Sequence, residues 1–121
     1  MIDFRAAFEC RINAEDPAAD FRPSPGTVTR WQAPGGPGVR LDTHVTTGYR
    51  IPPNYDSLAA KLLVWRPTRA EAIACMRRAL AEFTVEGVKT TIPRLCEIFD
   101  QPEFIAGKVD TTFIERTWPK E

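Results

Sequence analysis

One arginine of this chain follows a glycine-rich turn, a placement that suits it to bind an anion or a strongly polar ligand. The turn is Gly35-Gly36-Pro37-Gly38, and Val39 and Arg40 come directly after it. Glycine holds backbone conformations that other residues resist. A guanidinium presents its donors in a planar fork, which matches planar anions and carbonyl groups. On this pattern alone, an ordinary hairpin with a solvated arginine is the commoner interpretation.

A second turn follows about a dozen residues later and carries further polar side chains. Two prolines precede Tyr55-Asp56-Ser57, and Lys61 comes shortly after them. Such a segment most simply caps a turn or a helix start through an Asx-type hydrogen bond. The adjacent carboxylates Glu15 and Asp16 are expected to be solvated, because general acid–base pairs need facing geometry that sequence neighbours seldom have.

Several other chemistries find no support in the residue inventory. His44 is the single histidine, which removes a histidine-based metal site, and no metal site is expected. Cys10, Cys75 and Cys96 are an odd number, lie far apart and form no Cys-x-x-Cys pair, so reduced, core-filling thiols are expected. Neither a phosphate-binding loop nor a dinucleotide fingerprint is present. If the chain belongs to an enzyme, we do not expect it to hold the whole active site.

Length and charge restrict the class of protein further. The chain has 121 residues, enough for a single domain over residues 1–121, with 16 basic and 16 acidic residues. This balance argues against a general binder of nucleic acid or of anionic membranes. No apolar run approaches the roughly 20 residues that span a bilayer. Residues 1–5 do not resemble the start of a signal peptide, so a cytoplasmic protein is expected.

The elements that must position Arg40 begin with four predicted strands. Alternating apolar and polar residues predict a half-buried strand from Phe4 to Ile12, followed by an ordered loop over residues 13–26. Residues 27–31 and the apolar run 61–65 predict two more strands. From Val39 to Val45 the alternation points Val39, Leu41 and Val45 inward. Arg40, Asp42 and His44 then point outward, free to meet a ligand or a partner.

Helical patterns dominate the second half of the chain. Thr68 and Glu71 form a capping box, and the helix after them carries an apolar stripe of Ile73, Met76, Leu80 and Phe83. After a short β-like piece (85–89), a second helix is predicted to begin near Thr91, with the buried stripe Ile92, Leu95, Cys96 and Phe99. Asp110 or Thr112 is expected to cap a last short helix. Strands first and helices later predict an α+β fold with a small antiparallel sheet and helices packed on it.

Trp65 and Arg69 allow two interpretations. They stand at the end of an apolar strand and at the start of a helix, and both residue types are enriched in the hot spots of protein–protein interfaces. A contact between protomers is therefore one interpretation. The other, a Trp65 buried in the monomer core, has equal support from the sequence.

Five ordered blocks make nearly the whole chain resemble the C-terminal domain of biotin carboxylases. The blocks are Glu9-Cys10-Arg11-Ile12-Asn13-Ala14-Glu15-Asp16-Pro17, Pro23-Ser24-Pro25-Gly26, Ala33-Pro34 through Val39-Arg40, Tyr55-Asp56-Ser57 with Lys61-Leu62, and Gly87-Val88-Lys89-Thr90-Thr91-Ile92-Pro93 with Asp110-Thr111-Thr112-Phe113. Residues 12–16 and the stretch from His44 to Pro53 resemble acetyl- and acyl-CoA carboxylases more than pyruvate carboxylases. This resemblance implies a parent enzyme of fatty acid biosynthesis. Pro37 and Asn54 depart from the family pattern near Arg40.

The resemblance implies a division of labour within a ligase. In the family, an upstream ATP-grasp part binds Mg-ATP and bicarbonate, and biotin arrives on a carrier protein. That part is absent from this chain, so neither Mg-ATP nor bicarbonate is expected to bind the chain alone. The isolated chain is therefore predicted to be inactive. Arg40 matches the family arginine that binds bicarbonate and the ureido oxygen of biotin, which makes it the one predicted catalytic residue. Trp65 and Arg69 fall at the family's homodimer contact.

Two other functions stay open at the level of sequence. The first is a non-catalytic interaction module that binds a biotinyl carrier or a partner carboxylase. The second is a plain α+β domain that retains no site. The three hypotheses differ in whether Arg40 meets a ligand and in whether chemistry follows.

Overall fold

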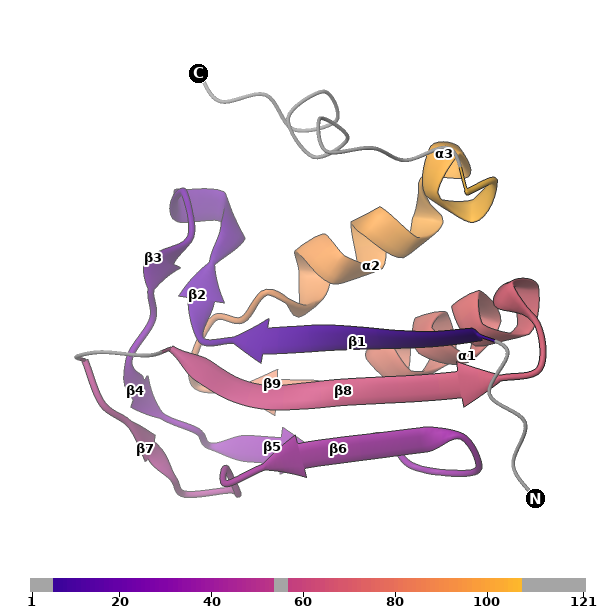
Figure 1. The fold of residues 1–121 in the computed structure, drawn as a ribbon. Helices are drawn as coiled ribbons and strands as arrows, with labels where there is room; N and C mark the ends of the chain where they lie inside the picture. The colour runs from indigo at the N-terminus through magenta and orange to yellow at the C-terminus, as the bar shows by residue number, and fades with distance from the viewer. Residues whose placement is uncertain (1–5, 54–56, 108–121) are drawn as a thin grey trace.

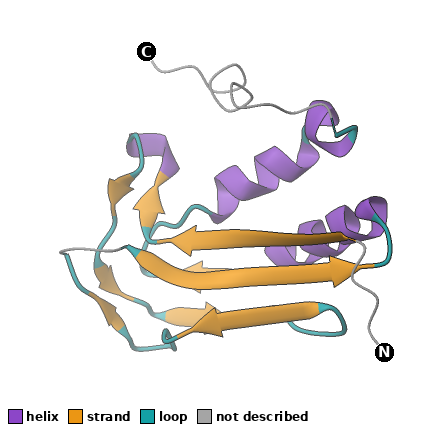
Figure 2. Cartoon of the chain, viewed as in Figure 1, coloured by secondary structure: helices purple, strands orange, loops and turns teal. Residues whose placement is uncertain are grey.

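The computed structural model describes residues 6–53 and 57–107, and these form one three-stranded sheet with helices on one side and short β-ribbons at one end (Figures 1 and 2). The predicted cap at Asp110 or Thr112, as well as Phe4, Asn54, Tyr55 and Asp56, lie outside the described residues. In chain order, the elements are β1 Ala6–Asn13, β2 Glu15–Asp16, the 3-10 helix Pro17–Ala19, β3 Arg22–Pro23, β4 Gly26–Thr27, β5 Arg30–Gln32, β6 Val39–Thr43, β7 Arg50–Ile51, β8 Leu58–Arg66, α1 Arg69–Glu82, β9 Thr84–Glu86, α2 Ile92–Asp100 and α3 Pro102–Ile105.

The main sheet has the order β1-β8-β6, and every neighbouring pair is antiparallel. Its central strand β8 pairs Leu62 with Cys10 of β1 on one side and with Leu41 of β6 on the other. Period-two alternation therefore aligns the apolar residues of all three strands on one face. The predicted α+β class with a small antiparallel sheet is confirmed.

The helices cover that apolar face. The α1 helix begins where the sequence predicts, because Thr68 Oγ1 accepts a hydrogen bond from the Glu71 backbone N–H at 3.2 Å. Pro93 occupies the first turn of α2, where a missing N–H costs no helical hydrogen bond. An ion pair of 2.9 Å between Arg77 and Asp100 joins the two helices on their outer side.

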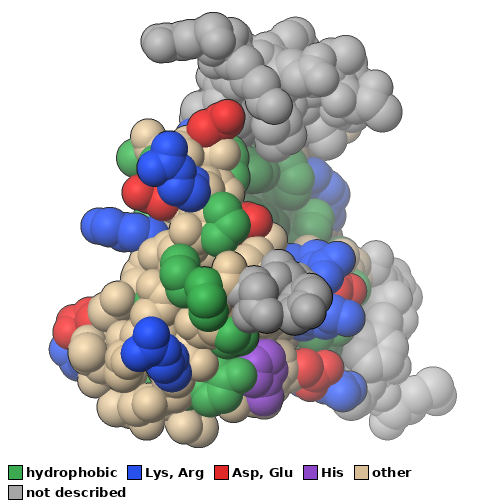
Figure 3. Space-filling view, turned by 90° about the vertical axis from the view of Figure 1, so that its left-hand side faces the viewer, with side chains coloured by type: hydrophobic (Ala, Val, Ile, Leu, Met, Phe, Trp, Pro, Cys, Tyr) green, Lys and Arg blue, Asp and Glu red, His purple; other side chains and the backbone are tan. Residues whose placement is uncertain are grey.

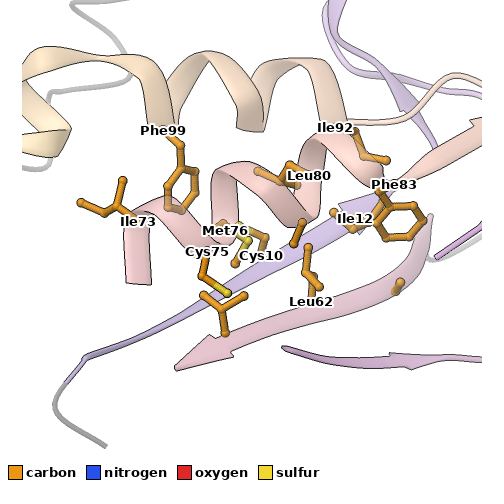
Figure 4. Close-up of a cluster of buried hydrophobic side chains, with 13 residues drawn as sticks. Cys10, Ile12, Leu62, Ile73, Cys75, Met76, Leu80, Phe83, Ile92 and Phe99 are labelled. Carbon is orange, nitrogen blue, oxygen red and sulfur yellow. The ribbon is translucent and has the colours of Figure 1, made fainter. Parts of the chain in front are cut away.

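The core lies between the sheet and the helices and includes the whole predicted stripe of α1 (Figure 4). Its buried members are Cys10, Ile12, Ala60, Leu62, Val64, Ile73, Cys75, Met76, Ala79, Leu80, Phe83, Ile92 and Phe99. Of the stripe predicted for α2, Ile92 and Phe99 are buried, while Leu95 and Cys96 are only partly buried. Phe8 meets Phe99 edge to face with ring centroids 5.4 Å apart, which ties β1 to α2. Burying an aliphatic side chain of this size contributes about 1.5–3 kcal/mol.

The second predicted strand, residues 27–31, is wrong as a single element. The chain changes partners at its centre, because Val28 N–H donates to Tyr49 of the β7 side while Thr29 N–H donates to Glu86 of β9. The result is two short strands, β4 and β5, in two different ribbons. The strand predicted over 61–65 is longer, and the piece predicted over 85–89 is the shorter β9.

A second, smaller cluster fills the end of the molecule where the ribbons lie. Its buried members are Ala14, Val28, Val45, Ile51 and Ala59. Val45 is buried as predicted, but β6 ends at Thr43, so Val45 belongs to this cluster rather than to the sheet. In the pairing of β1 with β8, Ile12 lies opposite Ala60 and Asn13 lies opposite Leu58. Ala59 is therefore an extra residue in β8, and this bulge directs the Ala59 side chain into the smaller cluster.

No helix in the described part of the chain is long and apolar enough to span a membrane. On the face that Figure 3 presents, basic and acidic side chains are interspersed, and hydrophobic side chains gather between them. The interspersed charges agree with the balanced composition and do not form a basic patch on that face.

Candidate functional site

Arg40 lies on the side of the sheet that faces away from α1 and α2. Val39 and Leu41 pack against the helix-side core, so alternation directs Arg40 and Asp42 to the opposite side, as predicted. We call this side the open sheet face. It carries Ala7, Glu9 and Arg11 of β1, Lys61, Leu63 and Trp65 of β8, and Arg40 and Asp42 of β6.

The glycine turn sets the position of Arg40 on β6 relative to the neighbouring strand β8. Gly38 has φ +75°, and its carbonyl accepts the Trp65 backbone N–H at 3.0 Å. A Cβ at this position would stand 2.6 Å from the Trp65 carbonyl oxygen, so only glycine fits between the two strands. This contact fixes the register that places Arg40 opposite Leu63.

Beside Arg40 lies an open hollow of about 510 Å³. Leu63, Trp65 and Ala7 give it an apolar floor, while Glu9 and Arg40 supply its charges. Leu63 is the direct partner of both Glu9 and Arg40, so the two charges lie on opposite sides of it in one row across the sheet. An apolar floor with a guanidinium at its edge suits a ligand that has a hydrophobic ring and a polar carbonyl.

Arg40 makes one side-chain hydrogen bond within the described residues. Its Nε donates to Asp42 Oδ1 at 2.9 Å, and both side chains are largely exposed, 65% and 48%. The guanidinium thus keeps the N–H groups of both Nη atoms for a ligand. The sequence predicted that Asp42 would share the outward face but did not assign it a role; the Arg-x-Asp spacing on one strand was the signal.

The structure does not bring Trp65 and Arg69 into one hollow. Trp65 lies half-buried on the open sheet face and is not a member of the helix-side core. Arg69 lines a different hollow of about 320 Å³ and donates to the carbonyl oxygens of Phe104 and Ile105 at 2.6 and 2.8 Å. Its guanidinium also lies 5.2 Å from the Phe104 ring centre, so Arg69 anchors α3 within the chain.

The expectation that Glu15 and Asp16 are solvated is wrong, since both are half-buried and hydrogen-bonded. Glu15 accepts from Ser57 Oγ at 3.1 Å and from Asn13 Nδ2 at 3.2 Å. Asp16 accepts from the Ala18 backbone N–H at 3.0 Å and caps the 3-10 helix. Glu15 therefore holds the entry to β8, because Ser57 directly precedes that strand.

Burial disfavours the thiolate form of two cysteines, Cys10 and Cys96. Burial raises the pKa of the Cys10 thiol to about 12, and the neighbouring Cys96 adds to the shift. Burial also raises the pKa of Cys96, helped by the carboxylates of Asp100 and Glu97. All three cysteines are free thiols. Cys10 and Cys75 are buried in the core as predicted, while Cys96 is only partly buried and packs against the edge of the core. His44 is exposed, as predicted, and stacks edge to face on Tyr49 at 5.2 Å.

No group of three or more metal-binding side chains occurs among residues 6–53 and 57–107. The arrangement around Arg40 instead favours recognition of a polar or anionic group by the arginine fork.

Residues 9–116 match the family model described as biotin carboxylase C-terminal domain. The chain is 55% identical to a biotin carboxylase of Nostoc sp. and 50% identical to biotin carboxylase 1 of Bacillus subtilis, each over 109 residues. Each alignment covers 90% of this chain, but only 24% of the relative. The chain therefore spans about a quarter of the proteins that it matches.

The fold also matches a solved structure. The crystal structure of the biotin carboxylase domain dimer of Hydrogenobacter thermophilus 2-oxoglutarate carboxylase, in complex with MgADP, ADP and bicarbonate, superposes with a TM-score of 0.88. Identity is 48%, and the match covers 91% of this chain and 24% of that one.

Proposed function

The chain belongs to the biotin carboxylase C-terminal domain family, and from this premise we propose that it completes the biotin site of a longer biotin carboxylase, with Arg40 as the residue that binds the ureido oxygen of biotin and bicarbonate. The match over residues 9–116 favours this ligase role over a non-catalytic interaction module. Mg-ATP and bicarbonate would be held by the ATP-grasp part of the longer protein, and biotin would arrive on a carrier protein.

The observation that carries the proposal is the placement of Arg40. It stands on an exposed sheet face at the edge of an apolar-floored hollow, and one carboxylate occupies its Nε. The Nη groups then have the planar geometry to donate to a carbonyl oxygen or to a carboxylate. Leu63 and Trp65 offer the apolar surface that the ring system of biotin would contact.

The chemistry follows from where charge develops. When N1 of biotin loses its proton to become the nucleophile, negative charge grows on the ureido oxygen. A fixed guanidinium at hydrogen-bond distance stabilises this charge more strongly than it stabilises neutral biotin. Removing one such preorganised donor typically costs about 3–4 kcal/mol of transition-state stabilisation.

Steady-state kinetics of the full-length enzyme with Arg40→Ala test this role. We expect kcat for biotin carboxylation to fall about 100- to 1,000-fold, while the dissociation constant for Mg-ATP stays unchanged. Arg40→Lys should resemble Arg40→Ala more than the wild type, since lysine keeps the charge but loses the fork. Arg30→Ala, at another exposed arginine paired with a carboxylate, is the matched control. Equal losses in carboxylation and in ATP binding would contradict the assigned role.

The finer assignments are part of the same proposal. A homodimer of the longer protein, with Trp65 and Arg69 at or near its contact, is consistent with the dimeric biotin carboxylase domain among the solved relatives. The cytoplasmic location also remains a prediction. An acetyl- or acyl-CoA carboxylase that serves fatty acid biosynthesis is one candidate for the parent enzyme. The solved relatives also include the biotin carboxylase part of a pyruvate carboxylase.

A further inference from the structure

The Arg40–Asp42 pair on the open sheet face has a geometry that goes beyond a solvated ion pair. The two residues lie two positions apart on β6, so their side chains leave the same face about 7 Å apart at the backbone. Asp42 is nevertheless close enough to accept a hydrogen bond of 2.9 Å from Arg40 Nε. The Asp42 and Arg40 side chains therefore extend toward each other along β6.

The bonded atom matters for what the arginine can still do. A guanidinium has five N–H groups, one on Nε and four on the two Nη atoms. Asp42 takes the Nε donor at the base of the fork, and this restricts rotation of the planar group about the end of its long side chain. The end of the fork, which suits a carbonyl or carboxylate ligand, remains available.

The neighbouring charges favour Asp42 in this role over other acids. Glu9 lies in the same row across the sheet as Arg40, but Leu63 stands between them. The backbones of Glu9 and Arg40 are therefore two strand spacings apart, about 10 Å. Asp42 lies directly opposite Lys61, and Arg11 follows Lys61 on the next strand. Asp42 thus has a cation on its own strand, Arg40, and another directly opposite on β8, Lys61.

We propose that Asp42 is a positioning residue that orients the Arg40 guanidinium through Nε so that its Nη groups meet the biotin ureido oxygen. The inference rests on the proposed function of Arg40. A carboxylate this close also weakens the net positive potential at the site, so its benefit must come from orientation and not from attraction. Removal of the hydrogen-bond acceptor and removal of the charge then have different consequences.

The test uses the full-length enzyme with Asp42→Ala and Asp42→Asn. Asparagine keeps an oxygen that accepts from Nε but carries no charge, so we expect its kcat to stay within about 3-fold of wild type. Alanine removes the acceptor, and we expect kcat to fall about 10-fold, less than the 100-fold that a displaced catalytic group can cost. KM for ATP should stay unchanged in both. Glu86→Ala, which removes the exposed partner of Arg30, is the control and should leave kcat unchanged.

A double-mutant cycle separates positioning from a merely structural role. In an Arg40→Ala background, Asp42→Ala should cause no further loss, because it acts only through Arg40. Asp42→Val, which suits a strand and also lacks an acceptor, gives the same measurement should the alanine variant fold poorly. An equal loss from Asp42→Ala in both backgrounds overturns the inference.

The remaining outcomes distinguish this inference from the proposed function. If Arg40→Ala abolishes carboxylation while Asp42→Ala and Asp42→Val both stay within 2-fold of wild type, the positioning role of Asp42 is wrong and the role of Arg40 stands. If Arg40→Ala retains wild-type carboxylation, the proposed function itself fails. Equal losses for Asp42→Asn and Asp42→Ala would show that charge and not orientation matters, which also overturns the inference.

Discussion

At the scale of single residues, the Arg40 side chain is exposed to solvent, yet a hydrogen bond restricts its conformation. Surface arginines usually lose much side-chain freedom when they bind a ligand, and this loss weakens binding. The hydrogen bond to Asp42 fixes part of that freedom before any ligand arrives. Exposed ion pairs of this kind add about 0–1 kcal/mol to stability, so its contribution to folding is small. Its value lies in the geometry that it gives to the guanidinium.

A prediction at this scale concerns the buried Cys10 thiol. Its pKa is raised to about 12, whereas the unfolded chain has the ordinary value of 9.0. The folded protein therefore binds this proton more tightly, so the stabilisation is complete below pH 9 and is lost progressively as the pH rises toward 12. Urea unfolding should show a free energy that falls over this range.

Alanine at the same position provides the comparison. Cys10→Ala should be less stable near neutral pH, because it leaves a small cavity, but its free energy of unfolding should fall less steeply above pH 9. Wild-type Cys10 should also resist alkylation at pH 8 in the folded protein, while half-buried Cys96 reacts slowly. Rapid labelling of Cys10 at neutral pH, or an identical pH slope in the variant, would contradict this account.

At the scale of elements, the turn before β6 and the strand β8 act as one unit. The Gly38 carbonyl bonds to Trp65, and the register that results places Arg40 beside Leu63. In a sheet, a slip of one residue moves every side chain to the opposite face. Such a slip would turn Arg40 into the core and Leu41 out of it. The turn thus protects both the core and the site.

Gly38→Ala should damage both stability and activity. The alanine Cβ would meet the Trp65 carbonyl oxygen at 2.6 Å and the Arg66 guanidinium at 3.0 Å, on a backbone with φ +75°. We expect a loss of about 1–3 kcal/mol in the free energy of unfolding, measured with urea. Carboxylation by the full-length enzyme should fall as well, because β6 must shift. Gly35→Ala is the control, since no atom beyond its own residue and its two chain neighbours lies within 4 Å of the added Cβ, and a matching loss there would argue against this explanation.

Local sequence patterns predicted the regular elements well and the irregular ones poorly. The capping contact at Thr68, the α1 stripe and the outward direction of Arg40 depend on short-range spacing, and the structure has them. The exchange of partners at Val28 and the extra residue at Ala59 depend on contacts with distant segments. No window of neighbouring residues contains that information. The same reason explains why Glu15, held by Ser57, was misjudged as solvated.

At the scale of the whole molecule, the two sides of the sheet have different tasks. The helix side holds the main core and keeps the strands in register. The open sheet face presents Arg40, a hollow and both signs of charge. The chain matches about a quarter of the length of its relatives, and we propose that the rest of the site comes from the remaining part of the longer protein.

The sequence could therefore predict which residue is the candidate for the site but not how the site is shaped. Five ordered motifs pointed to Arg40, and alternation predicted its face. The floor formed by Leu63 and Trp65 comes from β8, more than twenty residues later in the chain. It becomes visible only when the register between β6 and β8 is known. Alternation placed Asp42 on the same face as Arg40, but only the structure shows that Asp42 accepts a hydrogen bond from Arg40 Nε.

The most direct test of the central claim is one assay on three samples: bicarbonate- and biotin-dependent ATP hydrolysis by the full-length enzyme, by its Arg40→Ala variant and by this chain alone. We predict turnover for the wild-type enzyme, a loss of about 100-fold or more for Arg40→Ala, and no turnover above background for the isolated chain. Clear turnover by the isolated chain, or wild-type turnover by Arg40→Ala, would contradict the claim that this domain supplies Arg40 to a site completed by the rest of the enzyme.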